Sequence, residues 1–232
     1  MILRGFFAIF FLLACSVLHG QNPNLEIGFG LGITKGGLLP NISSDHEVSE
    51  VISPQGSVRA KFRIGEKSAI GINIATIILG NRQNLSTPII TINGEADRLE
   101  TRSALLAIDV LYRRYISDHW YVQGGPNVNY LAWSTGAAYL GDIRLFKLTE
   151  TDVYNRWHAG ATLSVGYTTK VDQSRKNAPW QVQVLWFIEL KSSATINHAI
   201  KSIAGEESGR FGYVELSTGF TFGSIGTPTG RN

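Results

Sequence analysis

The sequence holds few residues that could carry out catalysis together. His158 and Ser164 stand six positions apart in one alternating stretch, and "SSDHE" (43–47) places Asp45 beside His46. A catalytic histidine needs an acid or a nucleophile within hydrogen-bond reach. Six positions of a strand span roughly 20 Å, so His158 and Ser164 cannot pair. The pattern favours a histidine in a polar network over a catalytic one.

Metal and cofactor chemistry is supported no better. The stretch "DHEVSE" (45–50) could supply metal ligands and "SDHW" (117–120) repeats the Asp–His pair, but such neighbours arise by chance in loops. Gly124, Gly125 and Pro126 suggest a phosphate loop, yet neither a helix nor a Lys-Ser/Thr pair follows them. We therefore predict no catalytic residue, no metal site and no cofactor.

Composition narrows the class of protein. The chain has 232 residues, enough for one domain, and its formal net charge of +3 is too small to indicate nucleic-acid binding. Charged residues make up 17% of the chain, below the typical quarter. No segment after the N-terminus has the ~18 uninterrupted apolar residues that a membrane-spanning helix requires. We expect no such helix.

The N-terminus has the features of a secretory signal peptide. Arg4 supplies a positive charge, and an apolar run and several small residues follow it. We predict cleavage after Gly20, which gives a signal peptide at 1–20 and one domain at 21–232. Alternatively, "LLACS" is a lipobox and Cys15 becomes the lipidated first residue. Cleavage after Gly20 removes the only cysteine and so excludes disulfides.

After the signal peptide, the dominant hydrophobic period is two, which is the period of a strand. The stretch "GSVRAKFRIGE" (56–66) alternates Val58, Ala60, Phe62 and Ile64 with Arg59, Lys61 and Arg63. Eight segments of this kind are predicted as strands, at 25–34, 56–66, 69–78, 104–115, 120–133, 156–168, 180–191 and 212–223.

Short and long connections alternate between these segments. The short ones are 65–68, 116–119 and 172–179, and the long polar ones are 37–54, 80–102, 134–154 and 192–210. This alternation is typical of outer-membrane barrels. We predict an all-β fold, an eight-stranded antiparallel up-and-down transmembrane β-barrel with short periplasmic turns and four long extracellular loops. Within the long loop 80–102, residues 86–99 surround an Asn-Gly pair. They are expected to form a hairpin whose exposed strand edge a partner could bind.

The polar rows are expected to face the inside of the barrel. They are rich in Gly, Ser, Thr and Asn, which suit a narrow lumen better than a wet outer surface. Unpaired buried charge is costly, so we predict a lumen crosslinked by ion pairs, with no open pore. The members of this network are Glu26, Arg59, Lys61, Arg63, Asp109, Arg113, His158, Glu189, Lys191 and Glu215.

Aromatic residues on the apolar rows are spaced for two membrane interfaces. Trp120 and Tyr130 lie ten residues apart on one face, about the length of strand that crosses the hydrocarbon. Tyr and Trp favour such interfaces because their rings are partly polar. The predicted aromatic girdle comprises Trp120, Tyr130, Trp157, Tyr167, Trp180, Phe220 and Phe222, whereas Trp186 is expected mid-strand, outside either belt.

Three stretches carry a resemblance to a known family: the signal ending "GQ", the first strand "LEIGFGLGI" and the central "HWYVQGGPNVNYL". By these stretches the chain resembles the PorT-like, outer-membrane β-barrel domain family of Gram-negative bacteria. The resemblance implies a small barrel across the whole mature chain and, through PorT, a link to type IX secretion. Many relatives have no assigned role, and no functional residue transfers.

We predict a non-enzymatic barrel in the bacterial outer membrane, exported by its signal peptide. It would be an anchor, an adhesion protein or an accessory component, with type IX secretion one setting for it. Its partners would be the lipid bilayer and a protein at the extracellular loops or periplasmic turns, and not nucleic acid. The alternatives are an enzyme that hydrolyses lipid or peptide at the rim, a narrow solute channel, and a soluble lipocalin-like carrier.

Overall fold

The computed structural model describes residues 25–40, 47–65, 67–91, 94–149, 156–169, 182–195, 199–202 and 205–224. The predicted signal peptide, Cys15 and the turn at 172–179 lie outside these ranges. The strands are β1 (Leu25–Pro40), β2 (Glu47–Glu50), β3 (Ile52–Gly65), β4 (Ser68–Thr91), β5 (Gly94–Tyr115), β6 (Trp120–Leu140), β7 (Ile143–Thr149), β8 (Trp157–Thr168), β9 (Val182–Thr195), β10 (Ala199–Ser202) and β11 (Gly205–Ser224). Within the described ranges, no helix has the length and apolar character needed to cross a membrane.

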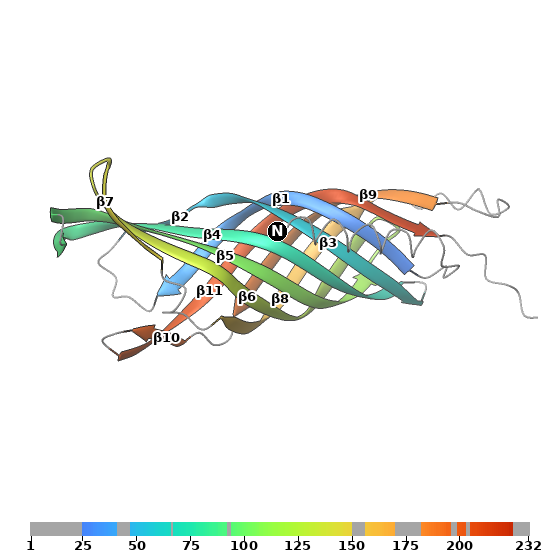
Figure 1. Cartoon of the computed structure of the whole chain (residues 1–232). Helices are drawn as coiled ribbons and strands as arrows, with labels where there is room; N and C mark the ends of the chain where they lie inside the picture. The colour runs from blue at the N-terminus through green and yellow to red at the C-terminus, as the bar shows by residue number, and fades with distance from the viewer. Residues whose placement is uncertain are drawn as a thin grey trace, which may run out of the picture.

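Eight of the described strands form a closed antiparallel ring (Figure 1). Their order is β1-β3-β4-β5-β6-β8-β9-β11, and β1 pairs with β11 to close the ring. Because this order follows the chain, the predicted eight-stranded up-and-down barrel is confirmed. Closure gives each strand two hydrogen-bonded neighbours, which is the condition for strands to exist in lipid.

The two faces of β3 differ in exposure. Arg59 and Lys61 are each 7% exposed, whereas Phe62 and Ile64 are 42% and 52% exposed. The same alternation of buried polar and exposed apolar side chains runs along β8, β9 and β11. The charged row of β3 therefore lies in the lumen and its apolar row lies outside. A soluble carrier with an apolar pocket has the opposite arrangement.

The regions predicted as long polar loops consist largely of strands. β4 and β5 remain paired as far as Thr91 and Gly94, so the predicted hairpin at 86–99 forms. β7 pairs with β6, β2 with β4, and β10 with β11. In Figure 1, β4, β5, β6 and β7 extend well past the ring at one end. The period of two does not reveal these extensions, because strand pairing outside the membrane does not need an apolar row.

Glycines line the inner face of β1 where it pairs with β11. Gly30 lies opposite Gly219, and Gly28 and Gly32 lie opposite Thr221 and Ser217. A Cβ on Gly219 would meet the carbonyl oxygen of Phe29 and lie 2.7 Å from the Cα of Gly30. The close approach of β1 and β11 at this seam therefore requires glycine.

Candidate functional site

The lumen near the short turns is crossed by ion pairs that begin at Glu26. Its carboxylate lies 2.5 Å from the Nζ of Lys61 and 2.7 Å from the Nε of Arg63. Lys61 also donates a hydrogen bond of 2.7 Å to the hydroxyl of Tyr115. Arg63 is the most exposed of the three, since its side chain keeps 33% of its accessible surface. This cluster links β1 to β3 and, through Tyr115, to β5.

Glu189 is the hub of the next cluster. Arg59 and Arg113 approach its Oε2 to 3.1 and 3.7 Å from two other strands. The hydroxyl of Tyr121 donates to Oε2 at 2.7 Å, and the amide of Gln123 donates to Oε1 at 3.0 Å. Residues of β3, β5, β6 and β9 thus meet at one carboxylate, so this hub crosslinks half of the eight strands in the ring.

Lys191 organises the third cluster. Its Nζ lies 2.6 Å from the carboxylate of Glu215 and 3.3 Å from that of Asp109. The amide of Gln55 also donates to Glu215 at 2.8 Å, and Asn73 donates to Asp109 at 2.9 Å. Lys191, Asp109 and Glu215 are each at most 1% exposed. Both carboxylates are therefore compensated inside the lumen, away from solvent.

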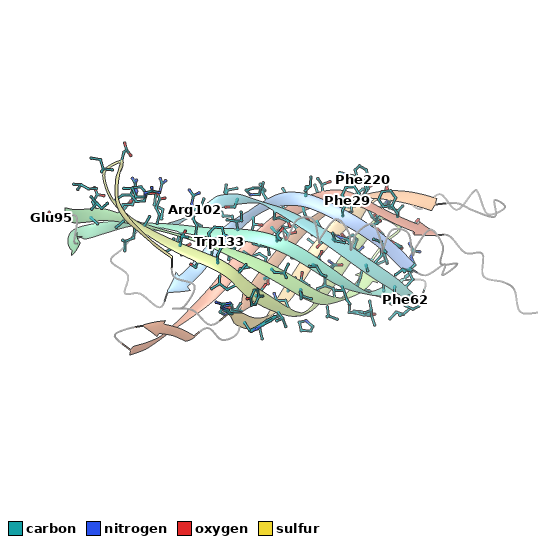
Figure 2. The ribbon with its side chains drawn as sticks, viewed as in Figure 1. Phe29, Phe62, Glu95, Arg102, Trp133 and Phe220 are labelled. Carbon is teal, nitrogen blue, oxygen red and sulfur yellow. The ribbon has the colours of Figure 1, made fainter. Side chains whose placement is uncertain are left out.

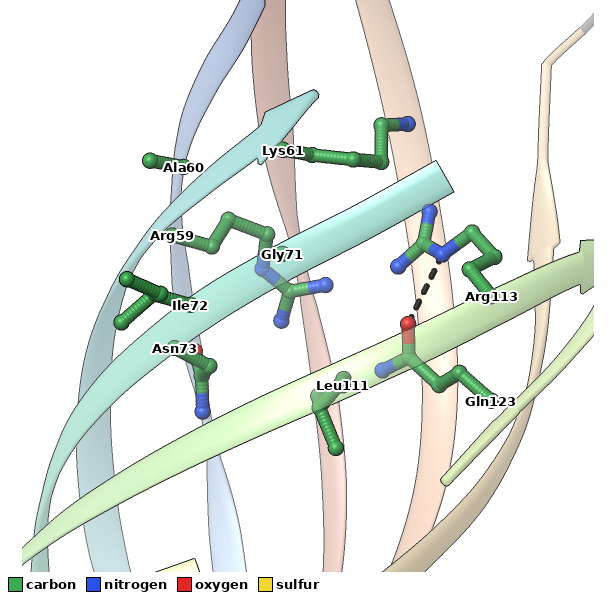
Figure 3. A pocket seen from close by; sticks show the side chains of 9 residues that line it. All are labelled: Arg59, Ala60, Lys61, Gly71, Ile72, Asn73, Leu111, Arg113 and Gln123. Carbon is green, nitrogen blue, oxygen red and sulfur yellow. Dashed lines mark hydrogen bonds between the residues drawn. The ribbon is translucent and has the colours of Figure 1, made fainter. Parts of the chain in front are cut away.

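A small cavity lies between these clusters (Figure 3). Its volume is about 20 Å³, and Arg59, Lys61, Arg113, Asn73 and Gln123 are among the residues that line it. Such a volume has room for about one water molecule. The hydrogen bond from Arg113 to Gln123, 2.7 Å long, crosses one side of the cavity in Figure 3. The cavity is too small for a solute path.

Toward the long hairpins, buried apolar side chains form a cluster in the lumen. This apolar lumen cluster consists of Ala75, Ile77, Leu79, Leu105, Ala107, Leu131 and Tyr213. The predicted lumen does not include this cluster, because only polar and small residues were expected in the interior. The signal was present in "ATIIL" (75–79), where apolar residues occupy both faces of the strand.

The two histidines in the described ranges, His119 and His158, do not assemble a catalytic site. His158 is buried on the inner face of β8, and Ser164 lies three inward positions further along the same strand. His119 stacks on Tyr167, with ring centroids 5.2 Å apart, and its Nδ1 lies 3.0 Å from the carbonyl oxygen of Thr168. Asp45 and His46 lie outside the described residues. Within the described ranges, no three His, Cys, Asp or Glu residues gather as a metal site.

The aromatic residues form pairs on the outer surface. Trp120 packs against Tyr167 with ring centroids 5.4 Å apart, and Tyr130 packs against Trp157 at 4.8 Å. Phe29 contacts both Phe220 and Phe222, at 6.1 and 6.0 Å, near the opposite rim from Trp133 (Figure 2). Trp180 lies outside the described residues. Trp186 of β9 pairs in register with Phe220, and its expected place outside either belt stays a prediction.

The hairpins beyond the ring are held together by side-chain contacts. Arg82 of β4 lies 2.9 Å from Glu100 of β5, and Arg98 lies 3.5 Å from the same carboxylate. The backbone N–H of Gly141, in the β6–β7 turn, donates to Asp97 at 2.9 Å. Gly141 has a φ of 57°, which suits a two-residue hairpin turn. The parts of β4, β5, β6 and β7 that extend past the ring, called the extension below, are therefore joined into one sheet by strand pairing, ion pairs and hydrogen bonds.

Comparison with known proteins finds one matching family model and several similar solved structures. A family model for the outer membrane protein beta-barrel domain matches residues 20–201. No curated protein matches the sequence. Similar solved structures include OprG from Pseudomonas aeruginosa, with 9% identity, 88% of this chain and 98% of that chain covered, and a TM-score of 0.41. The attachment invasion locus protein Ail of Yersinia pestis has 7% identity, coverages of 86% and 99%, and a TM-score of 0.40. Neisserial surface protein A has 11% identity, coverages of 85% and 95%, and a TM-score of 0.36.

Proposed function

The chain belongs to the outer membrane protein beta-barrel domain family, and on that basis we propose that it is a non-enzymatic outer-membrane anchor. The closed barrel would hold an ordered extracellular sheet, made of β2, β4, β5, β6 and β7, in place for a protein partner. The observation that carries this proposal is the pairing of β4 and β5, which runs from inside the ring to Thr91 and Gly94 with one irregularity between Asn84 and Ile89. The resemblance to PorT makes a component of type IX secretion the first partner to test.

An exposed strand edge gives this sheet a means of binding. β7 pairs with β6 on one side, and among the described strands no other partner pairs with it. An extended segment of a partner can add to such an edge through main-chain hydrogen bonds. Ile143, at the start of β7, is 67% exposed and would add an apolar contact. The proposed binding surface is therefore the β6–β7 side of the extension.

The two ends of the barrel should be distinguishable by labelling. We expect Asp142→Cys, in the β6–β7 turn, to react with a membrane-impermeant maleimide on intact cells. Lys67→Cys, in the turn between β3 and β4, should react only after the outer membrane is opened. Both positions are exposed, and a Cys15→Ser background removes the only native cysteine. Labelling of Lys67→Cys alone on intact cells would show the opposite orientation.

The closed lumen should not conduct ions. Leu105 and Leu131 are each at most 1% exposed within the apolar lumen cluster. The ion pairs of the lumen lie between this cluster and the short turns. Packed apolar side chains offer no path to an ion, because the cost of desolvating the charge is too high. We expect no single-channel steps from purified barrel in planar bilayers. Reproducible steps that depend on the protein would favour the narrow-channel alternative.

A shortened hairpin would test whether the extension carries the function. Thr135 of β6 pairs with Thr149 of β7, so Asn-Gly in place of residues 136–148 would join these strands by a two-residue turn and remove the proposed β6–β7 edge. We expect this variant to keep its heat-modifiable mobility on gels but to lose its crosslinked partner in native membranes. Partner capture equal to that of the full-length chain would contradict the proposal.

A further inference from the structure

An arginine patch lies on the outer face of β4 and β5, where the extension leaves the barrel. It consists of Arg82, Arg98 and Arg102 around Glu100. Residues 98, 100 and 102 alternate along β5, so all three point to the same face. Arg82 lies opposite Glu100 on β4. Three guanidinium groups around one carboxylate give the patch a formal charge of +2.

Within the patch, Arg102 differs from the other two arginines. Arg82 and Arg98 share the carboxylate of Glu100, and Arg98 also stacks over Tyr139, 4.6 Å from the ring centroid. Arg102 is exposed, and its side chain makes no ion pair or hydrogen bond with any described residue. Its register neighbours are Gly80 and Thr135, which are small and uncharged. Its guanidinium therefore has donors available to a ligand.

The position of Arg102 fits a lipid headgroup. Ala104, the next outward residue of β5, pairs with Trp133, which is 39% exposed on the outer surface. Figure 2 shows Arg102 and Trp133 close together at the base of the extension, with Glu95 at its far end. Tryptophan marks the boundary between hydrocarbon and headgroups, and one two-residue step of strand is roughly 7 Å. Arg102 thus lies just outside the hydrocarbon.

From this geometry we propose that the arginine patch binds a phosphate group of the phosphorylated glycolipid in the outer leaflet. Guanidinium binds phosphate through two parallel hydrogen bonds, and such charge-assisted bonds are strong. Arg102 would provide the main contact, and Arg82, whose side chain is 50% exposed, would provide the second. The inference rests on the proposed orientation, with the extension outside the cell.

The opposite rim provides a matched control. Arg114 lies on the same strand as Arg102, is likewise exposed, and faces outward beside Tyr112 and Ser68. It belongs to the end with short turns, which the proposed orientation places in the periplasm. Arg114→Gln therefore removes the same charge from the same strand without touching the patch.

The test measures how much glycolipid the purified full-length barrel retains, by native mass spectrometry. Nanodiscs of phosphatidylcholine would carry a bisphosphorylated glucosamine-disaccharide lipid or its dephosphorylated form. We expect the Arg82→Gln/Arg102→Gln variant to retain at least about tenfold less phosphorylated lipid than wild type, because it loses the charge-assisted hydrogen bonds of both arginines. Arg114→Gln should retain as much as wild type, and no form should enrich the dephosphorylated lipid.

Several outcomes would overturn the inference. One is equal retention of the two lipids by wild type, and another is a loss in Arg114→Gln as large as that in the double variant. The third is displacement of the phosphorylated lipid by inorganic phosphate at concentrations at which phosphate binds the protein equally well without lipid. If the double variant fails to fold, the single variant Arg102→Gln tests the inference. The side chain of Arg102 makes no hydrogen bond or ion pair with a described residue, so its loss should not affect folding. Cysteine labelling reports orientation separately, so failure of lipid binding with the expected labelling contradicts this inference and not the anchor.

Discussion

Replacing Lys191 with methionine should destabilise the folded barrel by about 3–5 kcal/mol. Lys191 lies between Asp109 and Glu215, and all three are almost completely buried. Methionine has similar length but no charge, so it leaves two carboxylates facing each other in the lumen. Breaking a buried pair costs more than the pair contributed, because the remaining charge has no solvent. The free energy of unfolding can be measured by urea titration in detergent micelles, followed by heat-modifiable mobility.

Two comparisons would show that the effect arises from buried charge. Lys35→Met removes an exposed lysine of β1 and should change stability by no more than about 0.5 kcal/mol. Combining Lys191→Met with Asp109→Asn and Glu215→Gln should recover much of the loss, because no unpaired charge remains. Acidification should also reduce the penalty in Lys191→Met, since protonated carboxyls are neutral. A loss equal to that of Lys35→Met would refute the proposed role of this ion pair.

The second large effect is expected at the seam that closes the ring. Gly219→Ala should destabilise the barrel by about 1–3 kcal/mol, the usual cost of overpacking. The new methyl group would meet the backbone of Phe29 and Gly30 and would lie 2.9 Å from the ring of Phe187. The backbone of β1 cannot move away without breaking its pairing with β11. The urea midpoint of the folded, heat-modifiable species measures the loss.

Gly56→Ala is the matched control for this substitution. Its nearest neighbours would be the side chains of Leu31 and Thr76, at 3.8 and 3.9 Å, which are ordinary contacts. Alanine also has less conformational freedom in the unfolded chain, so Gly56→Ala should be neutral or stabilising by up to about 1 kcal/mol. Equal stability of the two variants would show that the seam tolerates a side chain.

Much of the fold could be predicted from one local property, the period of two. In "SVRAKFR" (57–63), the alternation of side chains along a strand places Arg59 and Lys61 on one face and Val58 and Phe62 on the other. The composition of the polar rows then indicated which face was inside. The short turns at 65–68 and 116–119 followed from breaks in the same pattern. The outer extensions did not, because β7 and the ends of β4 and β5 are held by pairing between strands.

The sequence by itself determined the face on which each side chain lies, and with it the barrel class and the charged lumen. Only the tertiary structure decided the height of each side chain along the barrel. Glu189 meets Arg59 and Arg113, and Trp186 lies level with Phe220, because of the register between strands. Register and shear are collective properties of the closed ring. The face on which a side chain lies is fixed within one strand, whereas its contact partners depend on how all eight strands are staggered.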